Sequence, residues 1–157
     1  MTRVRGRALR GERVHDHAPA GHWCTTTMIS SIRIDGSTAC MTVQGPTDTP
    51  VFETFVESTL VPTLRPGDVV VMDNLPPHKA PPVIQRIEQV GARVLFLPAY
   101  SPDLKPIEKM WSKVKECLRA AKARTEEDLW AAIACALASI TPEDALHWFA
   151  SCGYSIT

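Results

Sequence analysis

The sequence predicts an α/β fold, a mixed sheet with flanking helices, and three observations support this class. Residues 69–72 form an apolar run that ends in Asp73 and is followed by Asn74 and two prolines, which is typical of a buried strand that stops at a sheet edge. A second such run, residues 93–97, follows one helical segment, as a βαβ unit requires. Earlier in the chain, β-branched residues flank Asp35-Gly36, which indicates a β-hairpin.

The N-terminal residues 1–13 carry five arginines against one glutamate, and two glycines disfavour a helix. This basic arm is either a DNA-contacting segment or a solvated chain end, and the sequence leaves both interpretations open. Four residues of types that can bind zinc follow, namely His15, His17, His22 and Cys24. Their spacing matches no common closed zinc site.

The first half of the domain is predicted to be a hairpin followed by a helix. Residues 23–34 and 37–43 read as strands joined by a two-residue turn at Asp35-Gly36. After Thr49-Pro50, apolar residues recur at helical spacing until Pro66-Gly67 ends the pattern. These residues are Phe52, Phe55, Val56 and Leu60.

The second half alternates strands and helices. Residues 68–73 and 93–97 are predicted strands, separated by a helix over residues 79–90. Pro106 suits the first turn of the next helix and places Glu108 in that turn. Its core-facing stripe is predicted to be Ile107, Trp111, Val114 and Leu118. Two C-terminal helices are expected within residues 124–157, the first buried because it is apolar nearly all round.

Composition limits the class of protein further. The 157 residues suffice for one domain, and 17 basic against 17 acidic residues give no global basic signature of a nucleic-acid binder. Five cysteines form no CxxC pair, which predicts buried, reduced thiols and a cytoplasmic location. No apolar stretch approaches the roughly 20 residues that a bilayer requires, so no membrane partner is expected.

Two acids are predicted to face each other. Asp73 ends a strand, Glu108 opens a helix, and the 34 residues between them have room for one crossover helix and one more parallel strand. Paired carboxylates at such a sheet edge suit a hard divalent cation, and magnesium uses one or two carboxylates beside substrate phosphates.

The same residues carry a family resemblance. Asp73-Asn74, His78-Lys79 and the run Tyr-Ser-Pro-Asp-Leu-Lys-Pro-Ile-Glu at residues 100–108, followed by Trp111, resemble the DDE-type transposase superfamily. The match is closest to the bacterial insertion-sequence branch related to the Tc and mariner elements. Lys105 stands where that family usually has asparagine, and Ala99 where it usually has a second proline.

The resemblance implies an RNase H-like fold that this chain joins at the second strand. It implies a partial catalytic domain over residues 1–157, truncated so that the first central strand and the first of three catalytic acids are lacking. That strand lies between the hairpin and the Asp73 strand in the family's fold. We therefore expect two half-sheets with unpaired edges, and a chain that is marginally stable or oligomerises through them.

The activity implied is metal-dependent DNA cleavage and strand transfer in transposition, with Mg²⁺ or Mn²⁺. Asp73 and Glu108 are the expected catalytic residues and metal ligands. Asn74, His78 and Lys79 are expected to support them, although a loop cap is an alternative role for the last two. Asp103 is expected to cap the helix that follows it.

The expected partners are the DNA of the element's ends and target, and a second copy or an intact transposase. A solvated surface is the alternative for the helical members of the expected DNA-binding set, which comprises Arg3, Arg5, Arg7, Lys105, Lys115, Arg119 and Lys122. Because the first acid is expected to be absent, enzymatic activity stays uncertain. The alternative function is an inactive remnant that binds DNA or an intact transposase and interferes with transposition.

Overall fold

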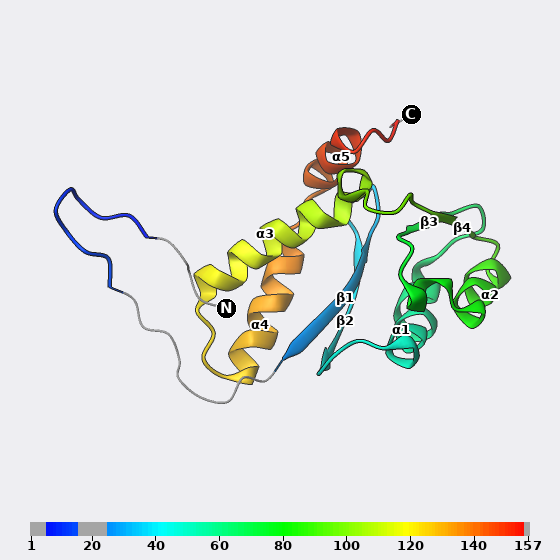
Figure 1. Ribbon diagram of the computed structural model, residues 1–157, viewed down its shortest axis with the longest axis horizontal. Helices are drawn as coiled ribbons and strands as arrows, with labels where there is room; N and C mark the ends of the chain where they lie inside the picture. The colour runs from blue at the N-terminus through cyan, green and yellow to red at the C-terminus, as the bar shows by residue number, and fades with distance from the viewer. Residues whose placement is uncertain (1–5, 16–24, 156–157) are drawn as a thin grey trace.

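The computed structural model describes residues 6–15 and 25–155, and the elements follow the predicted order (Figure 1). They are β1 (Thr26–Ile32), β2 (Thr38–Gln44), α1 (Thr49–Phe55), β3 (Val69–Met72), α2 (Pro81–Gln89), β4 (Arg93–Phe96), α3 (Pro106–Ala121), α4 (Glu126–Ala138) and α5 (Pro142–Ser151). This mixed α/β architecture is compatible with the RNase H-like fold that the resemblance implies.

The hairpin of β1 and β2 lies between two groups of elements, with α3 and α4 on one side and α1, α2, β3 and β4 on the other (Figure 1). Side chains alternate between the two faces of a strand, and β1 uses both. Met28 and Ile32 pack against the apolar cluster of α3 and α4, whereas Ile29 packs against the cluster built around α1. The hairpin therefore links two hydrophobic cores.

The turn of this hairpin is longer than predicted. Arg33 N donates to Ser37 O at 2.9 Å, so three residues rather than two separate the last bonded pair. Asp35 accepts hydrogen bonds from the backbone N–H and hydroxyl of Ser37, which holds the bend. Gly36 has φ +85°, the left-handed position that a three-residue hairpin loop requires. A Cβ there would lie 3.0 Å from the backbone of Thr141.

The first core forms where α1 meets β3 and α2. Its buried residues are Phe52, Phe55, Val56, Leu60, Met72, Val83, Ile87 and Ala92. The helix predicted from Thr49 is present, but after Phe55 it continues as a π-helical turn (Val56–Leu60) and a 3₁₀ turn (Val61–Thr63). Asp48 caps its start, because its carboxylate accepts from Val51 N at 3.0 Å.

Within the described residues, the four strands form two separate two-stranded sheets. β1 and β2 are antiparallel, and β3 and β4 are parallel with Val69 opposite Arg93 and Met72 opposite Phe96. β1 and β3 each pair with one neighbour, so each has an edge without a strand partner. This agrees with the expected pair of half-sheets.

The C-terminal helices form the second core. Met110, Val114 and Leu118 of α3 meet Ile133 and Ala136 of α4. The prediction that α4 is buried all round is wrong: one face packs on α3, while Trp130 remains 39% exposed and Cys135 is exposed. The alanines of α4 are apolar but small, so they add little surface that must be buried.

Three smaller findings complete the fold. Thr141 and Asp144 form a reciprocal capping box at the start of α5.

Among the described cysteines, Cys152 alone is buried, so the expected burial of the thiols is mostly wrong. None of the described cysteines forms a disulfide.

No single helix in residues 6–15 and 25–155 has the length and apolarity to cross a bilayer. α4 and α5 reach that length and apolarity only when taken together, and they are bent by 73° relative to each other.

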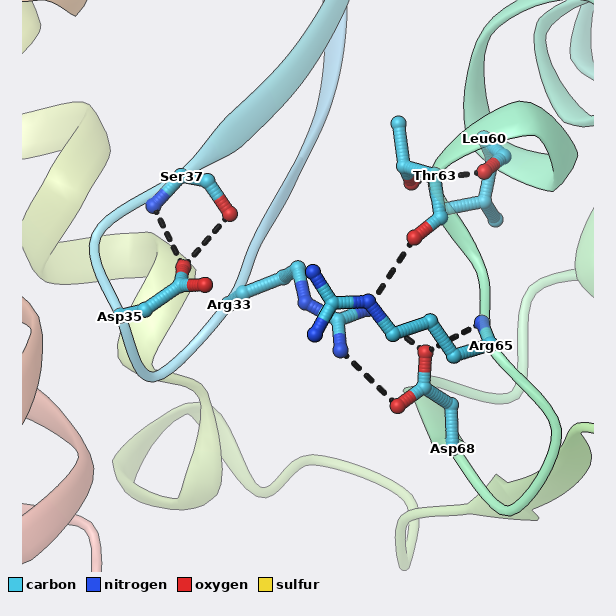
Figure 2. A network of polar contacts seen from close by, with 7 residues as sticks. All are labelled: Arg33, Asp35, Ser37, Leu60, Thr63, Arg65 and Asp68. Carbon is cyan, nitrogen blue, oxygen red and sulfur yellow. Dashed lines mark hydrogen bonds and ion pairs between the residues drawn. The ribbon is translucent and has the colours of Figure 1, made fainter.

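An ion-pair network ties the hairpin to the segment that leads into β3 (Figure 2). Arg33 donates to both oxygens of Asp68, at 2.7 Å and 2.9 Å, and its guanidinium also lies 3.4 Å from Thr63 O. The backbone N–H of Arg65 donates to Asp68 at 2.8 Å. This bidentate pair joins the turn of the hairpin to the residue just before β3.

We expect acidification to weaken this junction. The hydrogen bond from Arg33 lowers the pKa of Asp68 from 3.8 to about 2; burial opposes the shift and the Arg65 N–H assists it. Because the folded-state pKa is depressed, the stabilisation is present above about pH 4 and is lost as the pH falls toward about 2. Between about pH 5 and pH 2.5, wild type should lose roughly 1 kcal/mol more unfolding free energy than Asp68→Asn, measured by urea denaturation. Equal losses in both proteins would contradict this.

Candidate active site

Asp73 follows the last residue of β3 and is held by groups from two other segments. Lys105 Nζ donates to Asp73 Oδ2 at 2.8 Å, and the backbone N–H of Leu75 donates to Oδ1 at 3.3 Å. His78 Nδ1 lies 2.6 Å from Oδ1, but its orientation does not make a hydrogen bond. Both carboxylate oxygens therefore have nitrogen neighbours.

These neighbours determine the charge of Asp73. Partial burial raises its pKa, but the hydrogen bond from Lys105 and the bond from Leu75 N–H lower it, as do the charges of His78 and Lys105. The lowering contributions prevail, so the pKa of Asp73 lies below its ordinary value. The carboxylate is ionised at neutral pH, which is the state that a cation ligand requires.

Glu108 lies in the first turn of α3, where the sequence predicts it. Pro106 occupies the first helical position, and Glu108 is the acid of that turn. A carboxylate is favoured there because the helix N-terminus carries partial positive charge. Its side chain is exposed.

Asp73 and Glu108 line the same cavity, which has a volume of about 600 Å³. Asp73, His78, Lys105 and Glu108 all line it, together with every residue of β3 and most of β1. The cavity thus lies between the two sheets and carries the charged groups beside apolar strand residues. Asp68 lines it too, but precedes β3 and pairs with Arg33, whereas Asp73 follows that strand.

The other predicted support residues have different positions. Asn74 donates its side-chain amide to Leu97 O, so it ties the ends of β3 and β4 together. Lys79 is exposed and does not line the cavity. The ring of Phe52 lies 4.3 Å from that of His78, a contact between core and site that sequence reasoning missed. The recurrence of Phe52 at helical spacing marks it only as a core residue.

The structure places the predicted DNA-binding residues in several regions. Lys105 belongs to the cavity, while Lys115 and Arg119 are exposed on α3 outside it. Lys122 ends α3 with φ +51°. Arg7 is exposed, and Arg3 and Arg5 lie outside the described residues.

The described residues contain no cluster of three or more His, Cys, Asp and Glu side chains arranged to hold a metal ion. His15 is exposed, and the other residues considered as zinc ligands, His17, His22 and Cys24, lie outside the described part. Asp103 is exposed, and the described α3 has no side-chain cap bond, so the predicted capping by Asp103 is wrong. The N-cap position belongs to Lys105.

Comparison with known proteins identifies the family. Residues 1–130 match the family described as DDE superfamily endonuclease. The chain belongs to this family. The transposase of the transposable element Tcb1 from Caenorhabditis briggsae is 30% identical over 102 residues, covering 62% of this chain and 37% of that protein. The Tcb2 transposase of the same organism is 30% identical over 94 residues, covering 53% and 34%.

A third similar protein is the human histone-lysine N-methyltransferase SETMAR, which is 45% identical over 42 residues, or 27% of this chain and 6% of that protein. The chain thus spans just over a third of the length of the two transposases and a much smaller part of SETMAR. It is a transposase-like DDE endonuclease domain, as the motif at residues 100–108 predicts.

Members of this family generally use divalent metal ions, and two side chains that line the cavity are of a type that binds such ions. Asp73 and Glu108 supply carboxylate oxygens, the donors that Mg²⁺ and Mn²⁺ prefer. Asp73 Oδ2 already holds a positive group, the Lys105 ammonium, at 2.8 Å. Two carboxylates suffice for Mg²⁺ when water and substrate phosphates complete its coordination.

Proposed function

We propose that this chain is part of the catalytic domain of a transposase of the bacterial insertion-sequence branch. It acts in the cytoplasm on the ends of its element and on target DNA. The observation that carries the proposal is the position of Asp73 and Glu108 on one cavity, the first after a parallel strand and the second at a helix start. Cleavage of DNA and strand transfer are both phosphoryl transfers, which depend on positioning and charge neutralisation.

The residues at the cavity have distinct roles in this proposal. Asp73 and Glu108 would hold Mg²⁺ or Mn²⁺, and the ion would supply positive charge for activation of the attacking oxygen and stabilisation of the leaving one. His78 lies against Asp73, with Nδ1 2.6 Å from Oδ1, and so limits the space on that side of the carboxylate. Asn74 keeps the ends of β3 and β4 in register, and thereby the backbone position of Asp73.

DNA contact in this proposal comes from basic side chains outside the cavity lining. Lys115 and Arg119 lie on the exposed face of α3, the helix that Glu108 begins. Lys79, Lys122 and the arginines of residues 1–13 are further phosphate contacts. Because such contacts displace counterions from DNA, binding should weaken steeply with salt.

Within the described part of the chain, β1 and β3 each have an edge without a strand partner, and such edges suit a second copy or an intact transposase as partner. An inactive remnant that binds such a partner is the second candidate. The observation that favours it is that both oxygens of Asp73 have nitrogen neighbours, while Asp68, the one further acid lining the cavity in the described residues, is paired with Arg33. The family's three-acid pattern is then met by two acids at the site.

A cleavage assay separates these candidates. Supercoiled and linear DNA carrying the element's ends is incubated with Mg²⁺ or Mn²⁺ and either this chain or the chain extended by the residues encoded upstream of Met1. We expect strand cleavage by the extended form that Asp73→Ala abolishes. If neither form cuts, but the chain suppresses cleavage by an intact transposase, the remnant is the correct assignment. Cleavage by the Asp73→Ala variant would contradict the proposed site.

A further inference from the structure

We propose that Lys105 is a built-in counter-ion of Asp73, which a divalent cation must displace before it can bind that carboxylate. The inference rests on the proposed function, because it concerns the same carboxylate. Lys105 Nζ donates to Asp73 Oδ2 at 2.8 Å across 32 positions of sequence. Both side chains are mostly shielded from water, with 21% and 25% of their surface exposed. Shielding strengthens the pair relative to a fully solvated one.

The place of Lys105 in the fold supports this role. It occupies the N-cap position of α3 and makes no side-chain cap bond there. Serine, threonine, aspartate and asparagine are preferred at that position because their oxygen accepts a backbone N–H of the first turn. Lysine offers no acceptor, and its positive charge is unfavourable beside the positive end of a helix. Helix stability therefore does not explain Lys105, whereas its contact with Asp73 does.

Competition for one oxygen follows from this geometry. Oδ1 of Asp73 already faces His78 and the Leu75 N–H, so Oδ2 is the oxygen that a cation would reach by replacing Lys105. A displaced Lys105 side chain remains beside the cavity that Glu108 lines. There it can pair with an anionic phosphate group. Lys105 thus lowers metal affinity and acts through Asp73, as a positioning residue.

The test is a Mn²⁺ titration of the purified full chain by isothermal calorimetry, with free Mn²⁺ checked by electron paramagnetic resonance. Lys105→Gln removes the charge, Lys105→Ala is a second variant in case the first folds poorly, and Lys105→Arg retains the charge. Lys109→Gln is the matched control, because Lys109 is an exposed lysine next to Glu108 that does not line the cavity. Each protein is also prepared with Asp73→Asn.

We expect Lys105→Gln and Lys105→Ala to bind Mn²⁺ roughly fivefold to tenfold more tightly than wild type. Lys105→Arg and Lys109→Gln should stay within about twofold of wild type, and Asp73→Asn should abolish the site in every background. If Lys105→Gln binds no more tightly than wild type while Asp73→Asn abolishes binding, the inference fails and the proposed metal site stands. An equal gain in Lys109→Gln also overturns the inference. If no variant binds Mn²⁺, both fail.

Discussion

Replacing Glu108 by glutamine will reduce metal-dependent DNA cleavage at least about a hundredfold, because even residues that only support a metal's ligands cost about 10–100-fold when changed. Glutamine keeps the size of the side chain and removes its charge. Because Glu108 is exposed at a helix start, the fold should lose about 1 kcal/mol or less. The measurement is the single-turnover cleavage rate at saturating Mg²⁺, in the form of the protein that cleaves DNA.

Glu116→Gln is the matched control for this change. Glu116 is an exposed glutamate on the same helix, and it does not line the cavity. Its variant should cleave at the wild-type rate. If the Glu108→Gln protein keeps more than about a tenth of wild-type activity, Glu108 is not a metal ligand, because loss of a ligand should reduce the cleavage rate more than that.

Replacing Phe52 by alanine will cost about 3–5 kcal/mol of unfolding free energy, the usual range for deleting a buried phenylalanine ring. Phe52 is 6% exposed. The centroid of its ring lies 5.9 Å from that of Phe55 and 4.3 Å from that of His78. The loss is a large share of the roughly 5–15 kcal/mol that stabilises a typical domain. Because the ring also packs on His78, the support of Asp73 should loosen as well.

Denaturant unfolding followed by circular dichroism measures this effect. Leu9→Ala is the control, because Leu9 is 77% exposed and its removal should change stability by less than about 0.5 kcal/mol. A loss of less than about 1 kcal/mol for Phe52→Ala would contradict close packing of Phe52 in the core formed by α1, β3 and α2.

The features that the sequence predicted well depend on residues close together in the chain. A short β-branched run bounded by Asp73, Asn74 and two prolines favours a strand from local signals alone, and Pro106 starts a helix because its fixed φ suits the first turn. Asp73 and Glu108 line the same cavity, and the carboxyl end of a parallel strand is where α/β sheets usually bind ligands. That the two acids share a metal ion stays a prediction. The order of elements followed from these signals.

The wrong predictions arise where residue type is a weak guide to environment. Asp35-Gly36 favours a two-residue turn, but the Asp35 side chain bonds Ser37 and a three-residue loop forms. α4 is apolar in composition, yet its alanines leave much of it at the surface. Amino-acid composition does not show which face of a helix packs against a neighbouring element.

Contacts between segments that are far apart in the chain could not be predicted from the sequence. Arg33 meets Asp68 across 35 positions, and Lys105 meets Asp73 across 32. Each depends on how the hairpin, β3 and α3 are arranged in space, and no local periodicity records that. The departure at Lys105 was visible in the motif, but its partner became clear only in the structure.

The most direct test of the metal site is the position of Mn²⁺ in crystals of the protein grown with that ion. We expect an anomalous-scattering peak within about 2.5 Å of a carboxylate oxygen of Asp73, on the side that faces Glu108 and with Lys105 moved away. A peak held only by other residues, or crystals saturated with Mn²⁺ in which Asp73 still pairs with Lys105 and no ion lies between the two acids, would contradict the assignment of Asp73 and Glu108 as the metal ligands.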